Sequence, residues 1–302
     1  MKQLVYILML IITLTSCSGA KRDDKDNGNA RETGVPAPPI EKTQLNISIL
    51  LDLSDRISPS KYPAAPEHYQ RDLENIKTIT EFFRSNMQSL GAYKAKGKIR
   101  VFFSPPPTNP EINSIANKLN VDCSKMDNKG RKEVYDSITD LFTQNLEEIY
   151  KQTINTSAWE GSDIWRFFKN DAKDFCIDND SSYRNILIIL TDGYLYHKDS
   201  QYNNKNRTSY ILSNNLNPYR KSNWKDFIEQ KDFGIMTERN DLEDLEVLVL
   251  EINAENSKYK IDEDIISFLW KKWFEEMNIS HSEIYRSDLP ANTKKRIENF
   301  LK

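Results

Sequence analysis

Three short apolar runs constrain the fold of this chain more than any other feature of its sequence. They are Leu45 to Leu51, Asn185 to Leu190 and Leu245 to Ile252, and polar residues bound each of them. An apolar run without polar alternation is typical of a strand covered on both faces, as in a parallel sheet. Lys98 to Ser104 predicts a further strand, and Ser282 to Arg286 predicts a short edge strand.

Segments with helical periodicity separate these strands. Apolar residues recur at spacings of three and four, which is typical of a helix with one buried face. We expect helices at 69–90, 132–150, 162–174, 262–277 and 291–301. Residues 108–130 are polar and poorly patterned. The alternation predicts an α/β fold, a doubly wound and mostly parallel sheet with helices on both faces. Ligands of such folds bind beyond the carboxyl ends of the strands.

The amino terminus predicts export and a lipid anchor. Lys2 precedes an apolar run from Leu4 to Leu14, which is shorter than the about 20 residues of a membrane-spanning helix. The run therefore fits a secretory signal at 1–16, and its end, Leu-Thr-Ser-Cys, resembles the bacterial lipobox. We expect cleavage before Cys17 and its acylation, for instance with palmitate. The alternative is an ordinary signal peptide followed by a chance cysteine.

Residues 17–44 are expected to form a disordered tether, because they are polar and end in a proline-rich stretch. The acidic pair at 23–24 could influence sorting between membranes, or could simply be solvated. We expect a protein of the cell envelope, with the outer membrane favoured over the inner. The domain at 45–302 would then lie in the periplasm or at the cell surface, touching the membrane only through the anchor.

Composition excludes several functional classes. The formal net charge is −3 and no long block of like charge occurs, which argues against nucleic-acid binding. Only 9 glycines are present, and neither common glycine-rich phosphate loop is found. The three histidines lack metal-ligand spacing, so a zinc site is not expected. Cys123 and Cys176 could form a disulfide, or could be small buried apolar residues.

Polar motifs follow two of the apolar runs, and a third motif precedes the helix between them. They are Asp52-Leu53-Ser54-Asp55-Arg56, Thr191-Asp192-Gly193 and Gly161-Ser162-Asp163-Ile164. Their order resembles the von Willebrand factor A family, which carries D-x-S-x-S after its first strand, a threonine before a middle helix, and T-D-G after its fourth strand. In that family the three motifs build a metal-ion-dependent adhesion site. The resemblance covers about residues 45–302 in element order, but only a dozen residues in motif content.

The resemblance implies four metal ligands, Asp52, Ser54, Ser162 and Asp192, with Ser162 in the place of the family's threonine. It implies Mg²⁺, or Mn²⁺ or Ca²⁺, because two carboxylates and two hydroxyls are hard oxygen ligands. A protein partner could then offer a carboxylate to a vacant position on the metal.

Arg56 departs from the family pattern, since it stands where the second serine belongs. A guanidinium has no lone pair to give a cation. Arg56 could point away, leaving Asp55, Ser58 or water to fill the gap, or it could neutralise the pocket in place of the metal. Asp55, Arg56 and Asp163 are therefore expected to modulate the site, and an ion-pair cluster of Asp52, Arg56 and Asp192 remains the alternative to metal binding.

We expect an envelope-anchored binding module without catalytic residues. One alternative is a structural or scaffolding lipoprotein with a degenerate, metal-free site. A second is a phosphatase-like enzyme using Asp52 as nucleophile, but Ser54 stands where the haloacid-dehalogenase pattern needs a second aspartate.

The connection after Asp192 is unusually long. Residues 194–243 contain eight Tyr, Trp and Phe residues among many polar ones, where α/β connections are usually shorter. Tyr, Trp and Arg are enriched at recognition surfaces, so this insertion could set partner choice. Alternatively, its aromatic residues simply fold a small subdomain onto the sheet.

Overall fold

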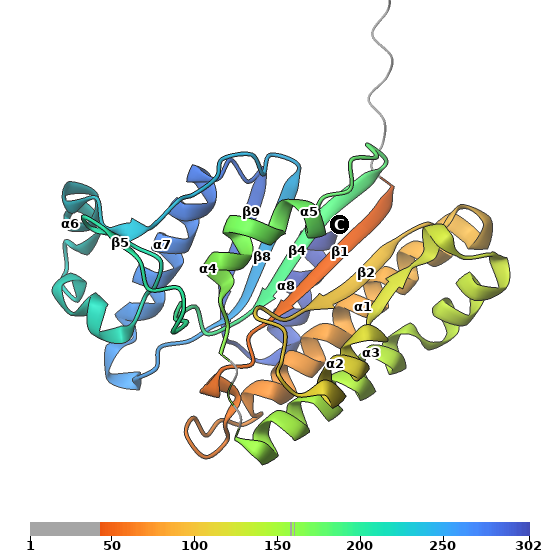
Figure 1. The fold of residues 1–302 in the computed structure, drawn as a ribbon, viewed down its shortest axis with the longest axis horizontal. Coiled ribbons are helices and arrows are strands. Elements are labelled where there is room, and N and C mark those ends of the chain that lie inside the picture. The colour runs from red at the N-terminus through yellow and green to blue at the C-terminus, as the bar shows by residue number, and fades with distance from the viewer. Residues whose placement is uncertain (1–42, 158, 160) are drawn as a thin grey trace, which may run out of the picture. The chain divides into compact units, whose positions relative to one another are not determined.

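A six-stranded sheet forms the centre of the computed structural model, which describes residues 43–157, 159 and 161–302 (Figure 1). The strand order is β3-β2-β1-β4-β8-β9. The strands are β1 (Gln44–Leu51), β2 (Lys98–Phe102), β3 (Asn120–Asp122), β4 (Tyr183–Leu190), β8 (Leu245–Ile252) and β9 (His281–Arg286). Only β3 runs antiparallel to its neighbour, so the predicted mostly parallel sheet is confirmed.

The apolar runs form the centre of the sheet because both of its faces are covered. All eight residues of β1 are buried, and β4 and β8 each have one residue that is only partly buried. Alternate side chains enter opposite cores: Ile47 and Ile49 point to one, whereas Leu50 and Leu187 point to the other. This two-sided burial explains why these strands lack the polar alternation of a half-exposed sheet.

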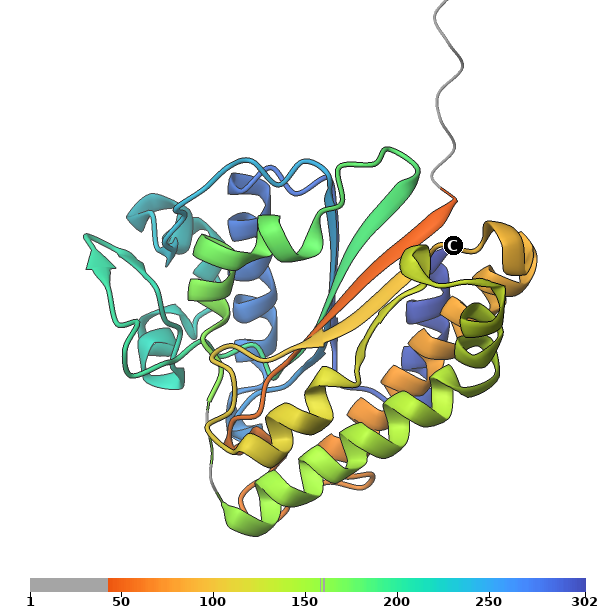
Figure 2. The ribbon, with the colours of Figure 1, turned by 45° about the vertical axis from the view of Figure 1, so that its right-hand side comes forward.

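Helices cover both faces of the sheet, which confirms the predicted fold class (Figure 2). One core is shared with α1 (His68–Lys94), α2 (Pro110–Asn117), α3 (Asn128–Thr156) and α8 (Pro290–Leu301). The other is shared with α4 (Ile164–Arg166), a π-helical turn at Phe167–Asp171, α5 (Ala172–Cys176) and α7 (Ile261–Glu276). Short 3₁₀ turns lie at Asp55–Ile57, Cys123–Lys125 and Ser257–Tyr259.

Residues 108–130 are more regular than their pattern predicts. They contain α2 and β3, and α2 begins where the Asn109 side chain accepts a hydrogen bond from the Glu111 backbone N–H. Ile112 is the only fully buried residue of α2, so the periodicity of so short a helix is weak. Cys123 and Cys176 are both free and buried, which matches the second of the two alternatives for these residues.

The insertion folds as a small subdomain against α7. It contains a three-stranded sheet of β5 (Asn203–Asn204), β6 (Arg207–Thr208) and β7 (Gly234–Ile235), a 3₁₀ turn at Ser213–Tyr219, and α6 (Trp224–Lys231). Tyr219, Trp224 and Phe233 are buried in the second core, as the subdomain alternative requires. Tyr196 and Tyr202 instead remain about half exposed. No helix in the described part of the chain is long and apolar enough to cross a membrane.

Candidate functional site

The three motif loops meet at the carboxyl edge of the sheet, between β1 and β4. The chain runs outward from β1 through β2 to β3 and then returns to β4 on the other side of β1. The strand order therefore reverses at this point, where α/β folds place their ligands. Two isolated backbone bridges join the loops, Leu53 to Gly161 and Ser162 to Tyr196. Residues distant in sequence are thus brought together by main-chain contacts.

Asp52 is buried, with only 2% of its surface exposed, and both of its carboxylate oxygens accept hydrogen bonds. The Ser54 backbone N–H donates to Oδ1 at 2.8 Å, and the Thr191 hydroxyl donates to Oδ2 at 2.8 Å. Thr191 belongs to the T-D-G motif, but motif matching does not identify this role for it. The two bonds fix the orientation of the carboxylate between the β1 and β4 loops.

Asp192 lies on the neighbouring loop, and its surroundings disfavour the negative charge of its carboxylate. Burial raises its pKa to about 8, and the negative charge of Asp52 acts in the same direction. Arg56 and a hydrogen bond from the Tyr194 backbone N–H, 3.0 Å from Oδ1, lower the pKa only in part. A cation in front of the two carboxylates would relieve this repulsion.

Gly193 shapes the turn that carries Asp192. Its φ is +93°, and a Cβ atom there would lie 2.5 Å from Ile252 and 2.7 Å from Ile266. The indole N–H of Trp270 donates to the Gly193 carbonyl at 2.8 Å and ties the turn to α7. The glycine of the motif is therefore required both by the backbone conformation and by the lack of space.

Ser162 is one of several residues that have a buried polar atom without a hydrogen-bond partner among the described residues, and it lines the cleft. The residue is 6% exposed, and within the described residues its hydroxyl makes no hydrogen bond. A buried hydroxyl without a partner costs free energy, typically about 1–3 kcal/mol. It lines the same cleft as Asp52, Ser54 and Asp192. This set of two carboxylates and two hydroxyls fits the oxygen ligation that Mg²⁺, Mn²⁺ or Ca²⁺ prefers.

Arg56 lies behind Asp52 and does not line the cleft. Its guanidinium donates to Asp72 Oδ2 at 2.6 Å and to the Leu190 carbonyl at 3.0 Å, while its Nε lies 3.7 Å from Asp52 Oδ2. Burial opposes its charge, but Asp72 and Asp52 together raise its pKa above the ordinary value. The arginine therefore points away from the cleft and still contributes charge to the back of Asp52.

Sequence reasoning missed the partners of Arg56. Asp72 is fully buried and also accepts a hydrogen bond from the Tyr150 hydroxyl at 2.9 Å. The sequence does indicate that Asp72 is buried, because it lies on the same helix face as Ile76, Ile79 and Phe83, at spacings of four, seven and eleven. Of the expected ion-pair cluster, the contact between Arg56 and Asp52 is present. Among the described residues no ion pair joins Arg56 to Asp192.

The other two expected modulators differ in character. Asp55 lines the cleft and forms a half-exposed ion pair with Lys61 at 2.5 Å. Asp163 is buried and committed to structure, since it accepts hydrogen bonds from the Arg166 backbone N–H at 3.1 Å and from the Ser200 hydroxyl. Its Oδ2 also lies 3.5 Å from His197 Nδ1. Asp163 therefore ties the start of α4 to the insertion.

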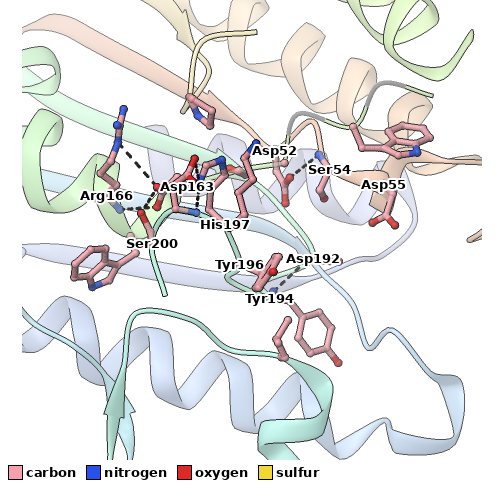
Figure 3. A pocket seen from close by; sticks show the side chains of 18 of the residues that line it. Asp52, Ser54, Asp55, Asp163, Arg166, Asp192, Tyr194, Tyr196, His197 and Ser200 are labelled. Atoms are coloured by element: carbon pink, nitrogen blue, oxygen red, sulfur yellow. Dashed lines mark hydrogen bonds and ion pairs between the residues drawn. The ribbon is translucent and has the colours of Figure 1, made fainter. Parts of the chain in front are cut away.

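These residues line a cleft of about 840 Å³ (Figure 3). Asp52 and Ser54 lie near its middle, Asp192 and Tyr194 on the β4 loop beside them, and Arg166 and Asp55 toward opposite ends. The volume lies within the usual 300–1,000 Å³ of ligand sites. Nowhere in the described ranges do three His, Cys, Asp or Glu side chains form a metal-ligand group, so the candidate site depends on its hydroxyls.

Comparisons with known proteins add little to this description. No protein-family model matches the chain, and neither does any curated protein. One similar solved structure is described as an aerotolerance-related membrane protein from Bacteroides fragilis NCTC 9343 with multiple mutations to serines. It is 14% identical, and the match covers 85% of this chain and 98% of that chain with a TM-score of 0.39. So weak a likeness carries no argument, and the α/β assignment rests on the sheet order and the two helical layers.

Proposed function

We propose that this chain is an envelope-anchored binding module that holds a protein partner through a divalent cation. Asp52, Ser54, Ser162 and Asp192 would hold the cation, as the resemblance to the von Willebrand factor A family implies. The cation would supply a Lewis-acidic position that a partner carboxylate can occupy. We propose no catalytic step, because binding of this kind needs neither a nucleophile nor a general base.

The observation that carries the proposal is the hydroxyl of Ser162. It is buried, without a hydrogen-bond partner among the described residues, and lines the cleft with two carboxylates. Buried polar groups are nearly always satisfied, so an exception calls for an explanation such as an ion. Asp192 lines the same cleft, and its burial and the negative charge of Asp52 raise its pKa.

A metal-free scaffold is the second candidate, and Arg56 favours it. The guanidinium places a permanent positive charge 3.7 Å from Asp52. It does not satisfy Ser162, however, and it forms no ion pair with Asp192 within the part of the chain that is described. We therefore prefer the cation-binding function.

Calorimetric titration of the purified chain in detergent tests the choice. We expect Mg²⁺, Mn²⁺ or Ca²⁺ to bind with one-site stoichiometry and to raise the melting temperature. Asp192→Asn should abolish both effects, whereas Asp136→Asn, at an exposed position of α3 outside the cleft, should change them little. If none of the three cations releases heat or shifts the melting temperature of the wild-type chain, the scaffold function replaces the one proposed.

The envelope anchor is a separate proposal, because Cys17 lies outside the described residues. Growth of a bacterial expression host with labelled palmitate should label the wild-type protein, and Cys17→Ser should remain unlabelled and leave the membrane fraction. Labelling that survives Cys17→Ser would contradict the anchor.

A further inference from the structure

Basic side chains gather at the end of the cleft that is remote from Asp55. Arg166 and Lys169 come from α4 and the π-helical turn that follows it, and Lys198 comes from the insertion. All three are exposed residues that line the cleft. We call these three residues the basic end. Asp55 lies toward the opposite end in Figure 3, and Glu255 also lines the cleft.

The charges of the basic end are only loosely neutralised. Arg166 is 46% exposed, and its one ion pair among the described residues is a contact of 4.0 Å with Asp163, which already accepts two hydrogen bonds. Lys169 pairs with Glu238 at 3.4 Å, and both of these side chains are partly exposed. Lys198 forms no ion pair among the described residues, and the exposed carboxylate of Asp199, the next residue, lies 3.9 Å from His197 Nδ1. These cations are therefore available to an anionic ligand.

Apolar surface accompanies the basic end. Tyr196, Tyr202 and Leu212 line the cleft with exposed fractions of 47%, 50% and 37%. Tyr202 packs on Trp165 with ring centroids 5.3 Å apart, and the Lys169 ammonium lies 4.9 Å from the Trp165 ring. Exposed aromatic side chains that rim a cleft mark a site of protein contact.

The backbone at the basic end is also unusual. Phe167–Asp171 is π-helical, and Lys169 and Asn170 within this turn both line the cleft. Single π-helical turns inside α-helices occur frequently at functional sites. Here the turn presents Lys169 to the cleft while Phe167 and Phe168 remain buried in the core.

We propose that the cleft binds an extended acidic segment of a partner protein, with two carboxylates that occupy opposite parts of it. One carboxylate reaches the cation site, and this part rests on the proposed function. The second lies against Arg166, Lys169 and Lys198, while the residues between them pack on Tyr196 and Tyr202. Arg presents a planar fork of donors that matches a carboxylate, and the lysines add point charges.

Binding of labelled synthetic peptides to the full chain in detergent tests this proposal. One probe series has two aspartates separated by Gly-Ser spacers of increasing length, because the spacer must match the span of the two positions. The matched series has asparagine in place of the second aspartate. With millimolar Mg²⁺, we expect the best-spaced two-aspartate peptide to bind about tenfold more tightly than its asparagine counterpart, a difference of about 1.4 kcal/mol. The gain should shrink as salt is added.

Charge-neutral variants show where the second aspartate binds. Arg166→Gln with Lys169→Gln should remove the tenfold gain without changing the affinity for the one-aspartate peptide. Lys173→Gln is the matched control, since Lys173 pairs with Asp241 and does not line the cleft. The proposal is overturned if the second aspartate adds nothing at any spacing, or if its gain persists in the double variant.

The same assay separates this proposal from the proposed function. If chelation of Mg²⁺ leaves one-aspartate binding unchanged while the gain from the second aspartate remains, the cation function fails and the basic end stands. If peptide binding still requires Mg²⁺ but the second aspartate adds no affinity, only the proposal for the basic end fails. Tighter peptide binding by Asp23→Asn with Asp24→Asn would identify the chain's own tether as the occupant and overturn the claim of a separate partner.

Discussion

The two sides of the Asp52 carboxylate differ in how the carboxylates on them are neutralised: Asp72 on the inner side pairs with Arg56, whereas among the described residues Asp192 on the cleft side has no ion pair. On the inner side, Arg56, Asp72 and Tyr150 form a buried network joined by hydrogen bonds of 2.6 and 2.9 Å, in which only Arg56 Nε and Asp72 Oδ1 lack a hydrogen bond among the described residues. On the cleft side, Ser162 has no partner among the described residues, and the pKa of Asp192 is raised to about 8. We therefore expect the inner side to contribute mainly to the stability of the fold, and the cleft side to contribute mainly to ligand binding.

The largest effect of a substitution is expected on the inner side. Asp72→Ala leaves the buried Arg56 with the Leu190 carbonyl and the longer contact to Asp52, and loss of one partner of a buried ion pair costs about 3–5 kcal/mol. Urea unfolding followed by circular dichroism measures this change. Asp55→Ala is the control, because its pair with Lys61 is exposed and should contribute less than about 1 kcal/mol. Equal losses for the two variants would contradict the difference between the two sides.

A pH effect follows on the cleft side. The pKa of Asp192 is raised above its ordinary value of 3.8 to about 8, so the folded state binds the proton more tightly than the unfolded state. Its contribution is fully present below pH about 4 and is lost as the pH rises through about 8. With EDTA present, the free energy of unfolding should fall over this range by on the order of 5 kcal/mol, since one pKa unit corresponds to about 1.4 kcal/mol.

The Asp192→Asn variant isolates this contribution from other titrating groups. Its free energy of unfolding should fall less over the same pH range, and saturating Mg²⁺ at pH 8 should restore stability to the wild-type chain only. If the free energy of unfolding changes with pH in the same way for the two proteins, the pKa of Asp192 is not raised in the folded state.

Gly193→Ala tests the turn between the two sides. The positive φ costs about 1–2 kcal/mol for alanine, and the contacts with Ile252 and Ile266 add to this, so we expect a loss of roughly 2 kcal/mol or more. Gly91→Ala shows the backbone cost alone, because its φ of +73° and ψ of 158° favour glycine but nothing lies within 4 Å of the new Cβ. Thermal unfolding measures both losses. A loss of less than about 1 kcal/mol for Gly193→Ala would contradict this account.

Ser162→Ala is expected to lose no stability. Without metal, removing a buried hydroxyl that has no partner should leave the free energy of unfolding unchanged or higher, because no hydrogen bond is lost and an unsatisfied polar group is removed. The same change should weaken Mg²⁺ binding about tenfold, or about 1.4 kcal/mol. Ser85→Ala, on the exposed face of α1, should change neither quantity. Substantial destabilisation by Ser162→Ala in EDTA would show that the hydroxyl has a structural partner.

The two sides also differ in how far the sequence predicts them. The cleft side follows short motifs at strand ends, and parallel strands bring their carboxyl ends to one edge, so these motifs suffice to predict that Asp52 and Asp192 lie together. The inner side depends on Asp72 and Tyr150, which come from α1 and α3. Their contact requires the packing of two helices, which no local pattern encodes.

The same reason explains the other gaps in the prediction. Uninterrupted apolar runs identified β1, β4 and β8, since burial on both faces leaves a clear pattern. The short α2 and β3 escaped detection because few of their residues are buried. The basic end escaped because Lys198 reaches it from the insertion, through contacts such as the hydrogen bond from Ser200 to Asp163.

Crystals soaked in Mn²⁺ test the central claim most directly. The account predicts one anomalous difference peak at the carboxyl edge of the sheet, with Asp52, Ser54, Ser162 and Asp192 around it, directly or through water, and Arg56 still directed to Asp72. A map with no peak among these residues at millimolar Mn²⁺, with Arg56 turned toward Asp192, would contradict it.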